Sequence, residues 1–87
     1  MMNTTKQQTK LAQLHRSTNF NSFEISYSNR CACFNCGQSF APAQITEWTD
    51  KDMTALCPHC HMDSVVPSYN GNPTDSESLA ELKRYAY

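Results

Sequence analysis

The chain has 87 residues and five cysteines, with a formal net charge of −1 at pH 7. Thirteen residues are Leu, Ile, Val or Phe, which is about 15% of the chain and below the roughly 20% that an ordinary core needs. The length allows one small domain and excludes a large enzyme fold with a deep site. The near-neutral charge argues against disorder and against a polybasic nucleic-acid or membrane module. The composition therefore predicts a small domain with an additional constraint such as a bound metal.

The cysteines are expected to face a reducing compartment. No stretch approaches the roughly 18 consecutive apolar residues of a membrane helix, and the polar first 20 residues do not resemble a secretory signal. We therefore expect a cytoplasmic protein, in which paired cysteines more often bind metal than form disulfides. The odd number of cysteines favours the same conclusion.

Residues 1–30 differ in composition from the rest of the chain. Half of them are Asn, Gln, Ser or Thr, and their net charge is +3, against −4 for residues 31–87. Leu11 and Leu14 could form a nascent helix, but two leucines alone cannot hold a helix against solvent. We therefore expect residues 1–22 to form a flexible polar and basic arm before a domain over residues 23–87.

Short strands are expected around the cysteines. Apolar and polar residues alternate over residues 23–28, which is the period of a β-strand. The pattern then predicts a hairpin return at residues 38–40, a helical turn between Ile45 and Trp48, and an exposed turn at 50–52. Residues 54–56 enter the second cysteine pair, and residues 64–66 leave it as a strand that ends at Pro67.

The end of the chain has the strongest helical pattern. Thr74 and Glu77 have the spacing of a capping box, with acidic residues in the first turn and basic residues in the last. Leu79, Leu82 and either Tyr85 or Ala86 form one apolar stripe. The sequence therefore predicts a helix over residues 75–86.

Four cysteines form two pairs with metal-binding spacing. Cys33-x-x-Cys36 and Cys57-x-x-Cys60 are separated by 20 residues. Each pair brings two thiolates to one side of a tight turn, and two such knuckles supply the four tetrahedral ligands that Zn²⁺ requires. Gly37 suits a residue that leaves the first turn with positive φ. Because four thiolates leave no open coordination position, we expect one structural zinc and no catalytic metal.

Two redox or cofactor motifs overlap the second pair. Cys57-Pro58-His59-Cys60 is the active-site tetrapeptide of periplasmic thioredoxin-like disulfide oxidases, and Cys57-x-x-Cys60-His61 matches the c-type haem attachment pattern. The first needs a βαβ scaffold, for which the chain has no room, and the second needs export. We expect neither.

Cys31 and His61 are the remaining candidate ligands. Cys31 lies two residues before Cys33, so both side chains can point to the same face of a strand. Either Cys31 or His61 could replace a knuckle cysteine. The spacing instead favours the set Cys33, Cys36, Cys57 and Cys60, with Cys31 as a packed thiol and His61 at the surface.

Further residues complete a wider pattern around the four cysteines. They are Phe34, Asn35, Gly37, Phe40, Pro42, Glu47, Trp48, Thr54, Ala55, Leu56, Pro58, Asp63, Ser64 and Val65. Together with the cysteines, this pattern resembles a family of small bacterial and phage proteins that are described only as uncharacterised cytoplasmic or zinc-ribbon proteins. The resemblance covers about residues 31–87 and implies a zinc ribbon followed by a terminal amphipathic helix. His61-Met62 stands where the family commonly has Gly-Ile.

Two aromatic residues have alternative roles. Phe34 lies between two ligands at a knuckle tip, where side chains often face solvent. Trp48 is expected to form a small core with Phe40 and Ile45, although it could also anchor a partner.

The fold class that follows is a small metal-stapled α+β domain, a zinc ribbon with a C-terminal helix. No catalytic grouping is recognisable around the histidines, so we do not expect an enzyme. We expect a protein-binding adaptor or modulator, in a phage setting an inhibitor of a host factor, because residues 31–87 are acidic.

Two other functions remain open. The first is a nucleic-acid-associated ribbon that uses Lys6, Lys10 and Arg16 of the basic arm. The second is a thiol redox protein, which requires a reactive Cys57.

Overall fold

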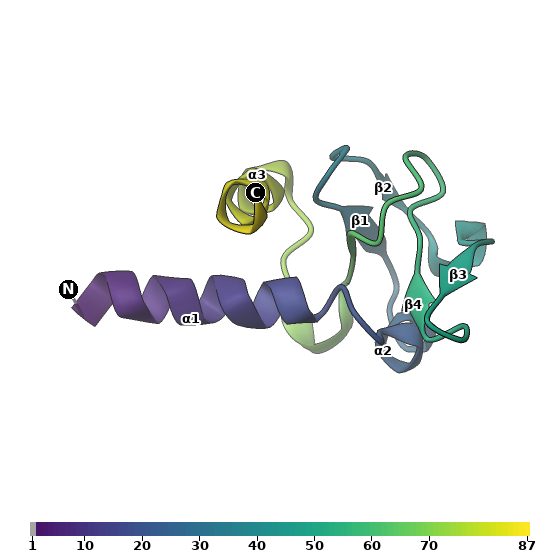
Figure 1. Cartoon of the computed structure of the whole chain (residues 1–87), viewed down its shortest axis with the longest axis horizontal. Helices are drawn as coiled ribbons and strands as arrows, with labels where there is room; N and C mark the ends of the chain where they lie inside the picture. The colour runs from purple at the N-terminus through teal and green to yellow at the C-terminus, as the bar shows by residue number, and fades with distance from the viewer. Residues whose placement is uncertain (1) are drawn as a thin grey trace.

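The computed structural model describes residues 2–87, with side chains from residue 9 onward. The molecule measures 41 × 22 × 21 Å along its principal axes. Helix α1 extends away from the rest of it (Figure 1). The helices and strands of the described part are, in chain order, α1 (Met2–Arg16), α2 (Ser22–Ser26), β1 (Cys31–Cys33), β2 (Ser39–Phe40), β3 (Trp48–Thr49), β4 (Thr54–Ala55), β5 (Val65–Pro67) and α3 (Ser76–Ala86). Two 3₁₀ turns lie at Pro42–Gln44 and Tyr69–Gly71.

The central sheet has the order β2-β1-β5, and β1 pairs antiparallel with both neighbours. Successive side chains of a strand point to opposite faces. Cys31 and Cys33 therefore pack on one side of β1 and Ala32 on the other, while Val65 and Val66 divide in the same way. We call these two sides the cysteine face and the helix face.

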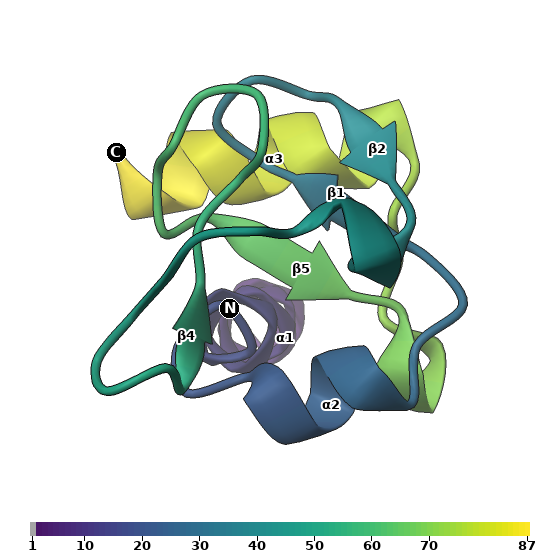
Figure 2. The same ribbon diagram turned by 90° about the vertical axis from the view of Figure 1, so that its right-hand side faces the viewer.

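Helices α1 and α3 cover the helix face and contact each other. The hydrophobic stripe of α3 is buried there, and Leu82 is fully buried. In Figure 2, which is turned by 90° from Figure 1, α3 lies behind the sheet and α1 is seen end-on. The buried residues of this face are Leu14, Ala32, Phe34, Val66, Leu79 and Leu82.

Helix α2 and the β3–β4 hairpin cover the cysteine face. Trp48 pairs with Ala55 across the hairpin and packs, partly buried, against this side of the core. The buried residues of this face are Ile25, Cys31, Cys33, Phe40, Ile45, Ala55, Cys57 and Val65. Three of the eight are cysteines, so fewer of the buried side chains on this face are large and aliphatic than on the helix face.

Buried Asn21 joins the two halves of the fold. Its side-chain amide donates hydrogen bonds to the carbonyls of Ser17 at 3.0 Å and Val65 at 2.9 Å. Its Oδ1 accepts a bond from the Ala55 N–H at 3.2 Å. Because the side chain is fully buried, it satisfies backbone groups of the α1 end, β5 and β4 that water cannot reach.

The N-terminal arm differs from its expected flexible form. Residues 2–16 form α1, and Leu14 is only 8% exposed where it packs against the helix face. Leu11 is partly buried at the same place. Two leucines are enough here because α3 and the sheet provide a tertiary surface, and the sequence pattern of residues 1–22 contains no sign of that surface.

The prediction of a strand over residues 23–28 is wrong. Residues Ser22–Ser26 form a helix in which Ile25 is buried, while Phe23 and Tyr27 are exposed. The apolar residues at positions 23, 25 and 27 therefore do not share one buried face, so the period of two was not a strand signal.

The C-terminal helix and the hairpin around the first knuckle are confirmed. Helix α3 begins at Ser76, and its N-cap is Asp75, whose side chain accepts a hydrogen bond from the Ser78 N–H at 3.0 Å. The helix is therefore capped by Asp75, one residue later than the predicted Thr74. Strand β2 pairs with β1 as expected.

The predicted helical turn between Ile45 and Trp48 lies earlier in the chain. A 3₁₀ turn occupies Pro42–Gln44, Ile45 follows it in extended conformation, and Trp48 begins β3. Pro42 at the first position of a short helix is favourable because its φ is already helical.

Candidate metal centre

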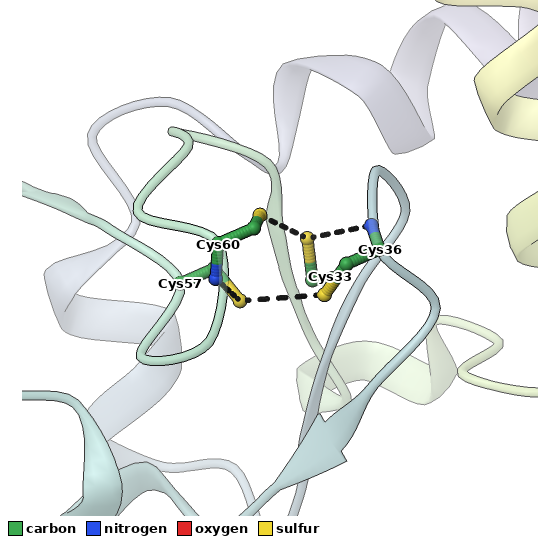
Figure 3. A group of neighbouring side chains, drawn as sticks. All are labelled: Cys33, Cys36, Cys57 and Cys60. Carbon is green, nitrogen blue, oxygen red and sulfur yellow. Dashed lines mark hydrogen bonds between the residues drawn. The ribbon is translucent and has the colours of Figure 1, made fainter.

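The structure brings together the four cysteines that the spacing singled out. The sulfur atoms of Cys33, Cys36, Cys57 and Cys60 all lie within 4.8 Å of one another. Cys33 is the last residue of β1 and Cys36 lies in the loop after it, whereas Cys57 and Cys60 lie in the loop after β4. Figure 3 shows that the two pairs face each other. Each of the five cysteines is free, so no disulfide competes for these thiols.

The first knuckle is closed by backbone hydrogen bonds. The Gly37 N–H donates to the Cys33 carbonyl at 2.9 Å, and the Cys33 N–H donates to the Gln38 carbonyl at 2.9 Å. Gly37 has a φ of 81°, as the spacing predicted, because the chain must leave the turn in the left-handed region. The turn directs the thiols of Cys33 and Cys36 toward the same point.

The second knuckle repeats this pattern with different residues. The His61 N–H donates to the Cys57 carbonyl at 2.9 Å, and the Cys57 N–H donates to the Met62 carbonyl at 2.9 Å. His61 adopts a φ of 67°, although it is not glycine. The turn geometry therefore tolerates a side chain at this position, at some conformational cost.

Hydrogen bonds from the backbone point at the sulfur atoms. The Cys36 N–H donates to Cys33 Sγ at 3.4 Å. The N–H groups of His59 and Cys60 donate to Cys57 Sγ at 3.3 and 3.5 Å. Such donors stabilise negative charge on the thiolates, which is the form that a metal binds.

Three side chains around the cluster were missed by sequence reasoning. The Ser64 hydroxyl lies 2.9 Å from Cys33 Sγ, and Asn35 Nδ2 donates to Cys60 Sγ at 3.5 Å. Lys83 Nζ of α3 donates to the Asn35 carbonyl at 2.9 Å. These contacts orient the ligands and link α3 to the cysteine cluster. Asn35 and Ser64 were named only for the resemblance, and contacts across 48 positions have no signal in a single sequence.

The thiol pKa values favour a bound cation over four free thiolates. Burial raises the pKa of Cys33, Cys36 and Cys57 above the ordinary cysteine value. Burial acts in the same direction on Cys60, but hydrogen bonds from the Asn35 side chain and the Met62 backbone outweigh it and lower its pKa to about 7. A metal must therefore displace protons from the buried thiols, so binding strengthens as pH rises.

Cys31 and His61 lie outside the cluster. The Cys31 thiol is fully buried, and burial raises its pKa to about 11, so it remains a neutral packed thiol. His61 Nδ1 lies 2.7 Å from Glu47 Oε1 at the surface. Among the described residues the cluster of possible ligands contains only the four knuckle cysteines.

Phe34 was expected to face solvent, but it is buried. It is 4% exposed and lies on the helix face, with its ring 5.9 Å from that of His15 and 5.7 Å from that of Tyr87. The tip of the first knuckle is therefore covered by α1 and by the end of the chain. Helix α1 supplies the cover that the sequence pattern did not predict.

Comparison with known protein families, curated proteins and solved structures finds no match. Along the described residues, no helix is long and apolar enough to cross a membrane.

Proposed function

We propose that the protein binds one Zn²⁺ ion through Cys33, Cys36, Cys57 and Cys60, and that the metal is structural. What supports zinc is the donor set, because a tetrahedral group of four thiolates is typical of zinc or iron. The cluster joins the first knuckle, which begins at the end of β1, to the second knuckle, which follows β4. Four thiolates fill the tetrahedral sphere, which leaves no position for a substrate.

We further propose that the zinc-bound fold is a non-enzymatic adaptor or modulator that binds another protein. The observation that carries this proposal is a group of exposed apolar side chains outside the metal cluster. Phe20, Phe23 and Tyr27 are each more than half exposed, and Met53 is 45% exposed. Exposed apolar residues gathered at one place are typical of interaction surfaces. An inhibitor of a host factor is one form that such a modulator could take.

Affinity capture from the native cell tests the adaptor function. The tagged zinc-loaded protein is expected to retain a specific protein that survives near-physiological salt and nuclease treatment. Capture of nucleic acid alone, or of nothing above the level of a tag-only control, would exclude an adaptor.

A nucleic-acid role is the second candidate, because α1 contains Lys6, Lys10 and Arg16 and no acidic residue. It predicts binding to DNA or RNA that falls steeply with salt. Removing residues 1–20 would also remove buried Leu14, so Lys6→Glu and Lys10→Glu are the better test. If binding is absent, or if those variants leave it unchanged, this function is excluded.

A further inference from the structure

The exposed apolar residues gather around α2. The Ser22 N–H donates to the Met53 carbonyl at 3.1 Å, and the Phe20 N–H donates to Thr54 Oγ1 at 2.9 Å. These bonds place Phe20 and Ser22 beside the β3–β4 hairpin, and Figure 2 shows α2 and β4 on the same side of the sheet. The exposed rings of Phe23 and Tyr27 instead lie 5.9 and 6.1 Å from the ring of Tyr69.

A groove lies between α2, the Pro42–Gln44 turn and the hairpin. It has a volume of about 710 Å³, which is within the range of sites that hold a ligand or several side chains. Its apolar lining includes Ile25, Pro42 and Trp48. Ser22, Ser26 and Asp52 provide the polar part.

The floor of the groove belongs to the cysteine face. Ile25 is buried with Cys33 and Cys57 in the same hydrophobic cluster, and Trp48 packs against that cluster. The second knuckle follows β4 directly, so a metal bound there would hold in place the strand that pairs with β3, to which Trp48 belongs. A groove held in this way before a partner binds would lower the entropic cost of docking.

Asp52 is the charged residue that lines the groove, and the hairpin segment around it is acidic. Residues 47–55 contain Glu47, Asp50 and Asp52 against Lys51. Asp50 Oδ2 accepts a bond from Thr54 Oγ1 at 2.9 Å, whereas the Asp52 carboxylate makes no hydrogen bond or ion pair within the described part of the chain. An unpaired carboxylate beside an indole favours a cationic partner group and disfavours phosphate.

The loop that places Asp52 has an unusual backbone. Asp50, Lys51 and Asp52 have φ values of 54°, 58° and 68°, so three consecutive non-glycine residues are in the left-handed region. The loop is closed by bonds from the Met53 N–H to the carbonyls of Thr49 and Asp50. Residues other than glycine adopt this conformation only where the surrounding structure imposes it. This turn brings Asp52 to the lining of the groove.

From the groove, its apolar floor and its acidic rim, we infer that this surface docks a short basic segment of another protein. An apolar side chain of that segment lies against Trp48 and Ile25, and a neighbouring Lys or Arg faces Asp52. This inference rests on the proposed adaptor function and adds to it the docking surface and the chemistry of the partner.

Trp48 is the single tryptophan of the chain, so its fluorescence reports directly on the groove. The probe is a set of synthetic hexapeptides with a central Leu, Phe or Pro flanked by Lys or Arg, together with matched peptides in which Glu replaces each basic residue. Zinc-loaded protein is titrated with each peptide. We expect saturable changes in emission with basic peptides, and none with the acidic set.

Variants then locate the site. Asp52→Lys is expected to reduce peptide affinity by about tenfold or more, and Ser26→Phe to reduce it by filling the groove. Asp63→Lys is the matched control, because it makes the same charge change at an exposed position that does not line the groove. Far-UV circular dichroism and zinc content verify that each variant folds.

Four results would overturn the inference: no fluorescence change with any peptide, equal changes with acidic peptides, equal loss in Asp63→Lys, or a stronger response to oligonucleotides. Affinity capture separates this failure from failure of the adaptor function. If Asp52→Lys and Ser26→Phe still capture the cellular partner of the unmodified protein, the adaptor function stands and the groove is not its site. If the unmodified protein captures no partner, both proposals fail.

Discussion

The two faces of the central sheet are stabilised in different ways. The helix face buries leucines of α1 and α3 against Ala32, Phe34 and Val66, as an ordinary small core does. The cysteine face buries Ile25, Phe40, Ile45 and Val65 together with three cysteines, and its remaining cover is a five-residue helix and a two-stranded hairpin. The shortage of large apolar residues therefore affects one face, and the candidate metal centre lies on that face.

This difference predicts that damage to the two faces has separable consequences. Loss of a ligand should unfold the cysteine face and release the metal. Loss of a leucine should weaken the helix face and leave the metal in place, provided that the protein remains folded.

Substitution of a ligand has the largest expected effect. Cys57→Ser should abolish stoichiometric zinc binding and most of the cooperative unfolding transition, because structural zinc contributes on the order of 10–16 kcal/mol in small domains. Zinc content and far-UV circular dichroism measure this. Cys31→Ala is the matched control, since Cys31 is equally buried but outside the cluster, and it should cost about 1 kcal/mol and retain the metal. Equal loss of zinc in both variants would contradict the assigned ligand set.

Truncation of the helix face comes second. Leu82 is fully buried, so Leu82→Ala should lower the free energy of unfolding of the zinc-bound protein by about 2–5 kcal/mol. Urea titration measures the loss, and the folded variant should still contain the same amount of zinc per chain. Zinc loss from the folded variant would show that the two faces do not act separately.

Asn21 lies where the two halves meet. Asn21→Ala leaves the Val65 carbonyl and the Ala55 N–H without a partner in a buried position, which should cost about 2–3 kcal/mol. Asn19→Ala removes the same side chain from an exposed position and should change the unfolding free energy little. Similar urea midpoints for the two variants would argue against a structural role for Asn21.

The two knuckles differ at one equivalent position. Gly37→Ala places a β-carbon on a residue with a φ of 81°, where no atom lies within 4 Å, so the cost is conformational and about 1 kcal/mol. His61→Gly removes the strain of the same conformation in the second knuckle, which is stabilising. It also loses an exposed contact with Glu47 and raises the entropy of the unfolded chain, and both of these effects are destabilising. Because the opposing effects are of similar size, the variant should change the free energy of unfolding little. A stabilising Gly37→Ala, or a His61→Gly that costs more than Gly37→Ala, would contradict this comparison.

The sequence was informative where local patterns determine the structure. Two Cys-x-x-Cys pairs and Gly37 predicted the cluster and the geometry of the first knuckle. The apolar spacing of Leu79 and Leu82, with charges that complement the helix dipole, predicted α3 and its buried side. In each case the signal lies within a few residues, so a single sequence contains it.

The sequence failed where a tertiary contact decides the outcome. Helix α1 packs through Leu14 only because α3 and the sheet provide a surface for it, and Phe34 is buried under the same elements. Asn21 resembles any polar residue of the N-terminal region, yet its bonds reach 44 positions along the chain to Val65. The contact from Lys83 to Asn35 spans 48 positions. No local pattern can predict such pairs.

The most direct test of the account is the metal content of the native protein together with its response to chelation. Purified without added metal, the folded chain should contain one zinc ion, and removal of that ion at neutral pH should abolish its near-UV circular dichroism and expose the thiols of Cys33 and Cys57 to alkylation. A folded protein with well under one zinc per chain, or a spectrum that chelation does not change, would contradict a metal-stabilised cysteine face.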